Sequence, residues 1–313
     1  MKLGLALPQY GVFADPSATL RVAAEAEAMG FDSLWVSDRL LLPVAPRDRY
    51  ITPDGVIPSA YENFLDPLTL LAAVATTTSR VRLGTSTLNA LWQPPALLAR
   101  TVTTLDQLSG GRIDLGIGVG WMRDEYQAVG VPWEGRGARL EETLDVLDAF
   151  WSHDVVAHEG PLWTVPESLV KARPVRRPPV LLAGLVPPAL TRVARRADGW
   201  LAVGLPLPML QATIASIRQQ AEAFGRDPGA LRFPLRINPH ITAEKADPAH
   251  VPHVGTIGQF ADYVRRVEGV VDEVFADFQL TANTVDEYLD LARAWRGQHP
   301  AAHGTVPGPV TDS

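Results

Sequence analysis

The residues of this chain that could do chemistry lie just after its short apolar segments. Ser37-Asp38-Arg39 follows one segment, and Ser86-Thr87-Leu88-Asn89 follows the next. Gly118-Val119-Gly120-Trp121 and Ala183-Gly184-Leu185 stand in the same position after two others. A carboxylate can orient a ring nitrogen or accept a proton, a hydroxyl can donate to a ring carbonyl, and glycine lets a ligand approach the backbone. These positions predict a floor against which a flat ring system could lie.

Each of these residues also has an ordinary structural interpretation. Asp38 could cap a loop or pair with Arg39, and Ser86 could be a buried hydroxyl that the backbone satisfies. The glycines from Gly116 to Gly120 could relieve crowding inside a barrel. The residues alone leave both interpretations open.

Several other kinds of chemistry lack the residues that they need. The chain has no cysteine, which excludes disulfides, thiolate metal sites and a cysteine nucleophile. His250 and His253 lie between prolines without the spacing of a metal site, so we predict no metal. No serine-hydrolase elbow or phosphate-binding P-loop occurs, and the glycine run does not fit a dinucleotide fingerprint. The only lysines, Lys2, Lys171 and Lys245, do not suit an aldolase or isomerase barrel.

The overall charge favours small molecules as partners. The 313 residues carry 28 Lys and Arg against 35 Asp and Glu, a formal charge of -7, so no general basic field is present to bind nucleic acid. The first residues show no signal-peptide pattern, and no segment is long and apolar enough to span a bilayer. We therefore expect a cytoplasmic protein with no nucleic-acid or membrane partner.

The elements that must position these residues alternate between short apolar runs and longer segments of helical period. This pattern is typical of parallel βαβ units and predicts a (β/α)8 barrel, a TIM barrel, over residues 1–296, with a disordered tail at 297–313. The strands are expected at Leu3–Leu7, Ser33–Ser37, Val81–Thr85, Ile113–Ile117, Val180–Ala183, Trp200–Val203, Phe233–Ile237 and Val274–Phe278.

Three longer insertions interrupt the repeat. Residues 39–65 and 238–255 follow strands, so they should emerge at the carboxyl end of the barrel, where loops build active sites. Residues 152–179 follow a helix and contain a predicted hairpin, His153–Val165. Aromatic residues in and near these loops indicate an apolar or aromatic substrate: Tyr50, Tyr61, Trp92 and Trp121.

In their order and spacing, the motifs resemble the luciferase-like monooxygenase superfamily, and within it the branch that depends on the deazaflavin coenzyme F420. The segments that carry the resemblance are Ala26–Asp38, Arg82–Ser86, Thr104–Arg112, Gly116–Trp121 with Glu125, and Ala197–Trp200. The resemblance implies a homodimeric barrel that binds a reduced flavin or deazaflavin and a small organic substrate. It also implies a cis peptide bond at Ser86–Thr87, beside the cofactor ring.

The resemblance also gives individual residues a role. Asp38 matches an acidic residue near the reactive ring, and Gly118, Gly120 and Trp121 match the loop beneath it. Ala183, Gly184 and Leu185 match the loop that holds the cofactor phosphate. Ser86, Thr87 and Asn89 complete the expected cofactor contacts.

The sequence departs from the family pattern at two places. Many relatives have Ser-Asp-His where this chain has Ser37-Asp38-Arg39, so a histidine acid or base cannot be carried over. Arg39 stays charged, and we predict that it stabilises negative charge on the reduced cofactor or substrate, or instead orders the lid through a pair with Asp38 or an acid of the long loop. The phosphate loop, Ala183–Pro187, has fewer glycines than is common in relatives.

The resemblance favours hydride transfer between reduced coenzyme F420 and a small organic substrate, with Asp38 and Arg39 as catalytic residues. The alternatives are an FMN-dependent monooxygenase that uses molecular oxygen, and a degenerate member that binds flavin without catalysis. A non-redox aldolase or isomerase barrel is the least supported.

Overall fold

Eight parallel strands close into a barrel in the computed structural model, which describes residues 1–51, 54–248 and 251–299. Nearly every residue of these strands is buried, as parallel strands covered by helices require. The barrel closes where β3 pairs with β5, with Leu83 beside Ile113. In chain order its strands are β1 (Lys2–Ala6), β2 (Ser33–Val36), β3 (Arg82–Thr85), β5 (Ile113–Gly118), β8 (Val180–Ala183), β9 (Gly199–Val203), β10 (Pro234–Ile237) and β13 (Glu273–Ala276).

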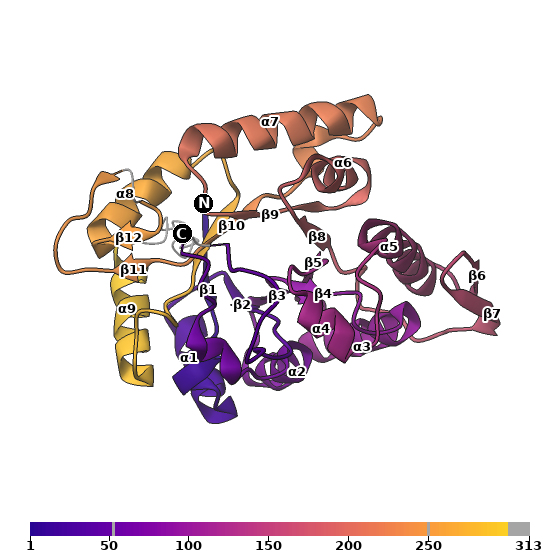
Figure 1. Ribbon diagram of the computed structural model, residues 1–313, viewed down its shortest axis with the longest axis horizontal. Coiled ribbons are helices and arrows are strands. Elements are labelled where there is room, and N and C mark those ends of the chain that lie inside the picture. The colour runs from indigo at the N-terminus through magenta and orange to yellow at the C-terminus, as the bar shows by residue number, and fades with distance from the viewer. Residues whose placement is uncertain (52–53, 249–250, 300–313) are drawn as a thin grey trace, which may run out of the picture.

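Helices surround the strands in sequence order, from α1 and α2 at the bottom of Figure 1, past α5 at the right and α7 at the top, to α9 at the left. Their bounds are α1 (Pro16–Ala28), α2 (Pro67–Thr77), α3 (Pro95–Ser109), α4 (Arg123–Ala128), α5 (Arg136–Ser152), α6 (Pro187–Arg196), α7 (Leu207–Ala223), α8 (Ile257–Val267) and α9 (Val285–Gly297). Short 3-10 helices cover Gly11–Phe13, Ser59–Glu62 and Pro228–Ala230.

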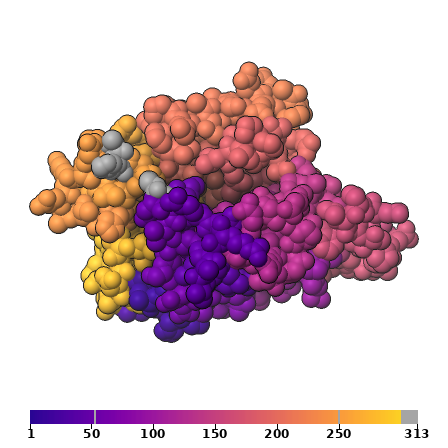
Figure 2. All heavy atoms as spheres, in the orientation of Figure 1, coloured from indigo at the N-terminus to yellow at the C-terminus, as the bar shows by residue number. Residues whose placement is uncertain are grey.

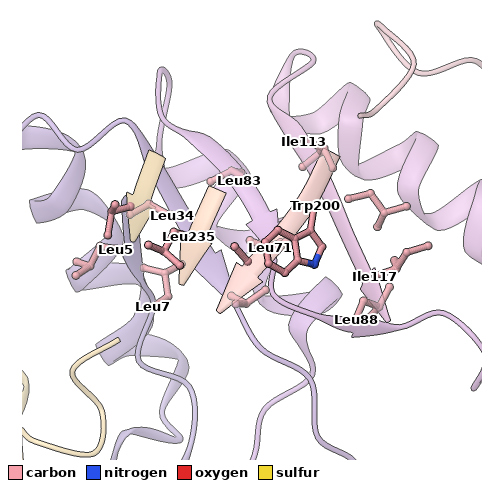
Figure 3. Close-up of a cluster of buried hydrophobic side chains, with 14 of the residues drawn as sticks. Leu5, Leu7, Leu34, Leu71, Leu83, Leu88, Ile113, Ile117, Trp200 and Leu235 are labelled. Carbon is pink, nitrogen blue, oxygen red and sulfur yellow. The ribbon is translucent and has the colours of Figure 1, made fainter. Parts of the chain in front are cut away.

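The main hydrophobic core lies between the barrel and its helices. Side chains alternate along a strand, so Leu5, Leu83 and Ile117 point outward to meet helix residues such as Leu71 (Figure 3). The opposite faces point into the barrel, where Trp35, Leu181, Leu201 and Phe275 form a separate layer. Burial of these two sets of side chains provides the main stabilisation of the fold.

Glycines make room for the inner layer. A Cβ on Gly84 would lie 2.3 Å from the Trp35 ring, and one on Gly116 would lie 1.9 Å from the backbone oxygen of Thr85. Those contacts are far too short for any real side chain. Of the two interpretations that the sequence left open for the glycine run, relief of crowding inside the barrel therefore holds for Gly116.

Polar residues close the amino end of the barrel. We call Ser33, Arg82, Asp114, Arg232 and Glu273 the amino-end network. Asp114 accepts hydrogen bonds from Arg82 Nε at 2.6 Å and from Arg232 Nη1 at 2.7 Å. Glu273 accepts from Ser33 and from Trp35 Nε1. The network joins strands from opposite parts of the barrel.

The structure confirms the predicted barrel and places each of the eight predicted strands, with ends shifted by a residue or two. It confirms the hairpin as β6 (Val155–Glu159) and β7 (Thr164–Leu169), which projects at the right of Figure 1. Sequence reading missed β4 (Leu88–Asn89), which adds to β5, and the pair β11 (His240–Ile241) with β12 (Val254–Gly255). Most of the predicted tail, residues 300–313, lies outside the described residues, as does His250.

Candidate active site

The carboxyl ends of the strands and the loop 39–65 gather at one face of the molecule. Figure 2 shows this loop in violet at the front, with the surface hollowed between it and the salmon region of α6 and α7. We call this hollow the mouth. The predicted site residues lie on the strand ends and turns that surround it.

Asp38 lies directly after β2 and is held by the backbone of a neighbouring strand. Its Oδ2 accepts a hydrogen bond from the backbone N–H of Asn89 at 2.9 Å. Burial, helped by the nearby charges of Glu125 and Asp66, raises the pKa of Asp38 to about 7, against the opposing effects of the Asn89 N–H and Arg39. A carboxyl group with this pKa can give or take a proton near neutral pH.

The Ser86–Thr87 peptide bond is cis, which confirms that prediction. Ser86 is buried, and its backbone oxygen accepts a hydrogen bond from Arg236 of β10. Arg236 also donates to Ser37 Oγ at 3.0 Å and to Asp277 Oδ2 at 2.6 Å. This one guanidinium thus ties together the ends of β2, β3, β10 and β13.

Asn89, Gly118 and Gly120 form a shallow cradle next to Asp38. A Cβ built on Gly118 would lie 3.4 Å from Thr87 Oγ1 and 3.8 Å from Ala183 Cβ, so the open space at Gly118 is about the size of one side-chain atom. Gly120 has φ +63°, and a Cβ there would lie 2.6 Å from Asn89 Nδ2. The buried Asn89 amide Nδ2 has no hydrogen-bond partner among the described residues. A buried donor without a partner is costly, and a ligand acceptor would satisfy it.

The predicted phosphate loop offers backbone donors and no cation of its own. Within the described part of the chain, the N–H groups of Gly184, Leu185 and Val186 have no hydrogen-bond acceptor. Gly184 has φ +139°, and Pro187 and Pro188 remove two further N–H groups from the first turn of α6. Three successive free N–H groups can bind an anion. Because of the two prolines, the first turn of α6 adds fewer N–H groups to this site than a glycine-rich turn would.

Arg39 contacts neither of the partners that the predicted lid role gave it, Asp38 or an acid of its own loop. Its Nη1 lies 3.3 Å from Glu125 Oε2 of α4, and only 9% of the Arg39 side chain is exposed. The guanidinium carbon lies 4.5 Å from the centre of the Trp121 ring, which is a cation-π contact. Glu125 Oε1 accepts from the Leu40 backbone N–H at 2.9 Å, so this pair anchors the start of the loop 39–65.

Three of the four aromatic residues noted in the sequence meet beside Arg39. The rings of Tyr50 and Trp121 are 5.4 Å apart, those of Tyr50 and Tyr61 are 5.9 Å apart, and the two tyrosine hydroxyls are 3.0 Å apart. No ring contact joins Trp92 to this group among the described residues. We call Tyr50, Tyr61 and Trp121 the aromatic wall.

The sequence alone assigned no role to Arg236 or Asp277, and Glu125 stood out only as part of a motif. A signal was available for Arg236, because it is a charged residue inside an otherwise apolar strand that ends at the mouth. Tyr10 also belongs here, since its hydroxyl reaches Asp277 Oδ2 at 3.4 Å. Through these contacts, Arg236, Asp277 and Tyr10 support the strand ends that carry the site.

Two other kinds of feature are missing from residues 1–51, 54–248 and 251–299. No three His, Asp or Glu side chains come together there in a way that could hold a metal ion. No helix in those ranges combines the length and apolar character needed to cross a membrane.

Comparison with known proteins matches residues 3–254 to the family model described as luciferase-like monooxygenase. An F420-dependent glucose-6-phosphate dehydrogenase of Kineococcus radiotolerans is 33% identical over 228 residues, which are 71% of this chain and 63% of that protein. A phthiodiolone/phenolphthiodiolone dimycocerosates ketoreductase of Mycobacterium bovis is 32% identical over 234 residues, 72% of this chain and 61% of that one. The chain thus matches less than two thirds of the length of either relative.

Solved structures of low sequence identity share the fold. The monooxygenase RslO1 of Streptomyces bottropensis has a TM-score of 0.79 at 21% identity, with 96% of this chain and 98% of that chain covered. An F420-dependent secondary alcohol dehydrogenase, solved with an F420-acetone adduct, has a TM-score of 0.76 at 17% identity, with coverages of 94% and 98%. With the family model covering more than half of its length, this chain belongs to the luciferase-like monooxygenase family.

Proposed function

We propose that this protein is an oxidoreductase that binds coenzyme F420 at the mouth and uses it to reduce the carbonyl group of a small organic substrate. The observation that carries the proposal is Asp38, a carboxyl group with a pKa of about 7 at the edge of a glycine-lined cradle. The names of two relatives support it, one as an F420-dependent dehydrogenase and the other as a ketoreductase.

The residues present fit a flat cofactor ring with a polar edge. The unpaired Nδ2 of Asn89 can donate to a ring oxygen, and the open space at Gly118 lets the ring lie close to the backbone. The free N–H groups of Gly184, Leu185 and Val186 can hold the cofactor phosphate. When bound in its reduced form, coenzyme F420 supplies a hydride ion, which carries two electrons.

The protein's own part in such a reduction is proton delivery and orientation. In its protonated form, Asp38 would give its proton to the substrate oxygen as the carbonyl π bond breaks, while the hydride forms the new carbon–hydrogen bond. The substrate would become an alcohol with the two electrons that the bound cofactor would supply, and the Asp38 carboxylate would recover a proton from solvent. The Asn89 N–H to Asp38 bond fixes the carboxyl group for this transfer.

A second candidate is an FMN-dependent monooxygenase. The observation in its favour is the phosphate loop, because three backbone N–H groups without a cation suit the single terminal phosphate of FMN as well as the phosphate of coenzyme F420. In that case Asp38 would lie beside a flavin ring, and molecular oxygen would be the second substrate.

Titration of the purified protein with coenzyme F420 and, separately, with FMN tests the two candidates. We expect saturable binding of coenzyme F420, followed in its reduced form by oxidation when a ketone is added under anaerobic conditions. Tighter binding of FMN with oxygen uptake would support the monooxygenase instead. Binding of either cofactor without turnover of any carbonyl compound or oxygen would indicate a degenerate member, and binding of neither would overturn the proposal.

A further inference from the structure

The two arginines that reach the mouth from inside the fold are both neutralised by buried carboxylates. Arg39 lies 3.3 Å from Glu125, whose side chain is fully buried. Arg236 lies 2.6 Å from Asp277, which is 2% exposed. Each arginine already has a carboxylate partner, so neither is free to pair with a charged group on a ligand. If an arginine turned to a second anion, its buried carboxylate would lose its partner.

A carboxylate, a thioether and two aromatic rings surround the Arg39 guanidinium. Glu125 lies at one edge, Met122 Sδ lies 4.0 Å from Nη1, and the rings of Trp121 and Tyr61 lie 4.5 Å and 5.9 Å from the guanidinium carbon. Glu125 in turn accepts from the Leu40 N–H, which keeps its carboxylate in place. Arg39 is therefore a structural cation that Glu125 compensates.

The other arginines near the mouth are engaged as well. Arg47 lies 3.5 Å from Asp124, Arg123 pairs with Asp48, and Arg49 donates to the backbone oxygen of Asp54. Lys245 is exposed on the loop 238–255, where solvent and salt screen its charge. An incoming phosphate or carboxylate would find Asp38 and Glu125 nearby and, in the described part of the chain, no buried cation free to meet it.

The surface beside Arg39 suits an uncharged ligand. The aromatic wall of Tyr50, Tyr61 and Trp121 presents half-buried rings, and the paired tyrosine hydroxyls add a polar spot that can bind a neutral oxygen. Such rings stack on flat apolar groups without needing a counter-charge.

We propose that Glu125 sets the charge selectivity of this enzyme: by neutralising Arg39, it makes the mouth select uncharged, flat or aromatic carbonyl compounds and reject phosphorylated or carboxylated ones. This inference rests on the oxidoreductase function proposed above. The expected preference differs from that of the relative whose name specifies glucose 6-phosphate, an anionic sugar. Glu125 belongs to the motif that carries the family resemblance, so the feature particular to this chain is the pairing of Glu125 with Arg39. Glu125 acts through Arg39, so it is a specificity-determining residue that need not touch the reacting atoms.

The test compares acetophenone with its carboxylated analogue, 4-acetylbenzoate, which has the same ketone and ring and adds one carboxylate. For the wild-type protein we expect kcat/KM to be at least tenfold higher for acetophenone. Glu125→Gln leaves Arg39 without its carboxylate, so it should lower KM for the carboxylated ketone at least tenfold and change KM for acetophenone little. The matched control is Asp124→Asn on the same helix, which removes the half-buried partner of the exposed Arg47 and should keep the wild-type preference.

A double variant distinguishes an effect of charge from a loss of the contact that anchors the loop 39–65. Arg39→Met with Glu125→Gln removes both charges, so it should restore the preference for acetophenone that the single variant loses. Equal use of both ketones by the wild type, or an unchanged preference in Glu125→Gln, would overturn the inference. Binding of the two ketones is also followed by tryptophan fluorescence without cofactor, so that a charge preference can be measured even if neither cofactor binds and the proposed function fails.

Discussion

At the residue scale, the site is a set of ionisable groups whose surroundings give them different tasks. Asp38 is half-buried, and its loss of solvent, together with the charges of Glu125 and Asp66, raises its pKa to about 7. Asp277 is buried against Arg236, and Glu125 against Arg39. Burial also raises the pKa of Glu125, an effect that Arg39 opposes. Asp38 is the only one of these three carboxyl groups without an arginine within ion-pair distance in the described structure, which makes it the group able to exchange a proton.

We predict that ketone reduction depends on protonated Asp38. The rate of the chemical step should be highest below pH 7 and should fall as the pH rises through about 7, because the carboxyl group then loses the proton that it delivers. Asp38→Asn keeps an acceptor for the Asn89 N–H and cannot deliver a proton. It should slow the step by about 10²- to 10⁴-fold and flatten the pH profile. Single-turnover oxidation of the reduced cofactor between pH 5 and 9 measures both effects.

The control for that experiment is Asp66→Asn. Asp66 raises the pKa of Asp38 through its charge, and it caps α2 through a hydrogen bond from the Thr69 N–H at 2.7 Å, which asparagine can also accept. We expect this variant to move the midpoint of the profile to lower pH with the maximal rate retained. A wild-type rate that does not vary across this pH range would contradict the role of Asp38.

A second residue-scale prediction concerns Arg39. If it only anchors the loop 39–65, Arg39→Met should weaken substrate or cofactor binding while the single-turnover rate at saturation stays within a few-fold of wild type. If it stabilises charge in the reaction, that rate should fall by roughly a hundredfold, or about 3 kcal/mol. Its pairing with Glu125 leads us to expect the first result. Rates and binding constants measured on the same variant separate the two roles.

The sequence could locate Asp38, Ser86, Asn89 and Gly118, because residues after parallel strands must meet at one end of a barrel. It could not pair Arg39 with Glu125. That contact joins an irregular loop to the short helix α4, and no period or spacing links residues 39 and 125. The role of Arg236 depended on knowing which face of β10 turns inward.

At the element scale, strand ends carry the site and long loops enclose it. Short runs rich in apolar residues made the eight barrel strands predictable, since strands covered on both sides bury nearly all of their residues. The two-residue strand β4 follows the cis peptide and was too short to leave a pattern in the sequence. The pair β11 and β12 joins the two ends of the loop 238–255, so its partners were not adjacent in the chain.

The inner glycines test how tightly the strands are packed. In Gly116→Ala, the new Cβ would lie 1.9 Å from the Thr85 backbone oxygen and 2.3 Å from Leu201 Cδ1, so β3 and β5 could not keep their separation. We expect a loss of more than about 3 kcal/mol in the free energy of unfolding, measured by urea denaturation. Gly258→Ala in α8 is the control, because its Cβ would be 3.9 Å from the nearest atom. That variant should differ from wild type by less than about 1 kcal/mol. If Gly116→Ala lost no more free energy of unfolding than Gly258→Ala, the barrel would relieve the clash at little cost.

At the scale of the whole molecule, the residues that stabilise the barrel and the residues of the candidate site lie at opposite ends of the barrel axis. The amino-end network joins strands at one end, while Asp38 and the mouth occupy the other. Burial opposes ionisation of Asp114, but hydrogen bonds from Arg82 and Arg232 outweigh it and lower its pKa. The charge of Asp114 is therefore present at neutral pH and holds β3, β5 and Arg232, two residues before β10, together.

We predict that Asp114→Asn destabilises the protein by about 3 kcal/mol at pH 7, because it leaves two partly buried arginines without their anion. The matched control is Asp148→Asn. Asp148 also pairs with two arginines, Arg177 at 2.8 Å and Arg196 at 3.4 Å, but its side chain is 44% exposed, whereas that of Asp114 is fully buried. Solvent screens the exposed cluster, so the control should lose less than about 1 kcal/mol. Urea denaturation of the two variants measures the difference that burial makes.

The pH dependence gives a further test of the same residue. A carboxyl group whose pKa is lowered by folding stabilises the folded state above its unfolded-state pKa, and this contribution is lost as the pH falls through the folded-state value. The stability gap between wild type and Asp114→Asn should therefore be largest near neutral pH and shrink in acid. Because Asp114 lies at the end of the barrel away from the mouth, the folded variant should bind cofactor as the wild type does. A gap that stays constant down to the lowest pH at which both proteins fold would show that the charge of Asp114 is not what stabilises the amino end.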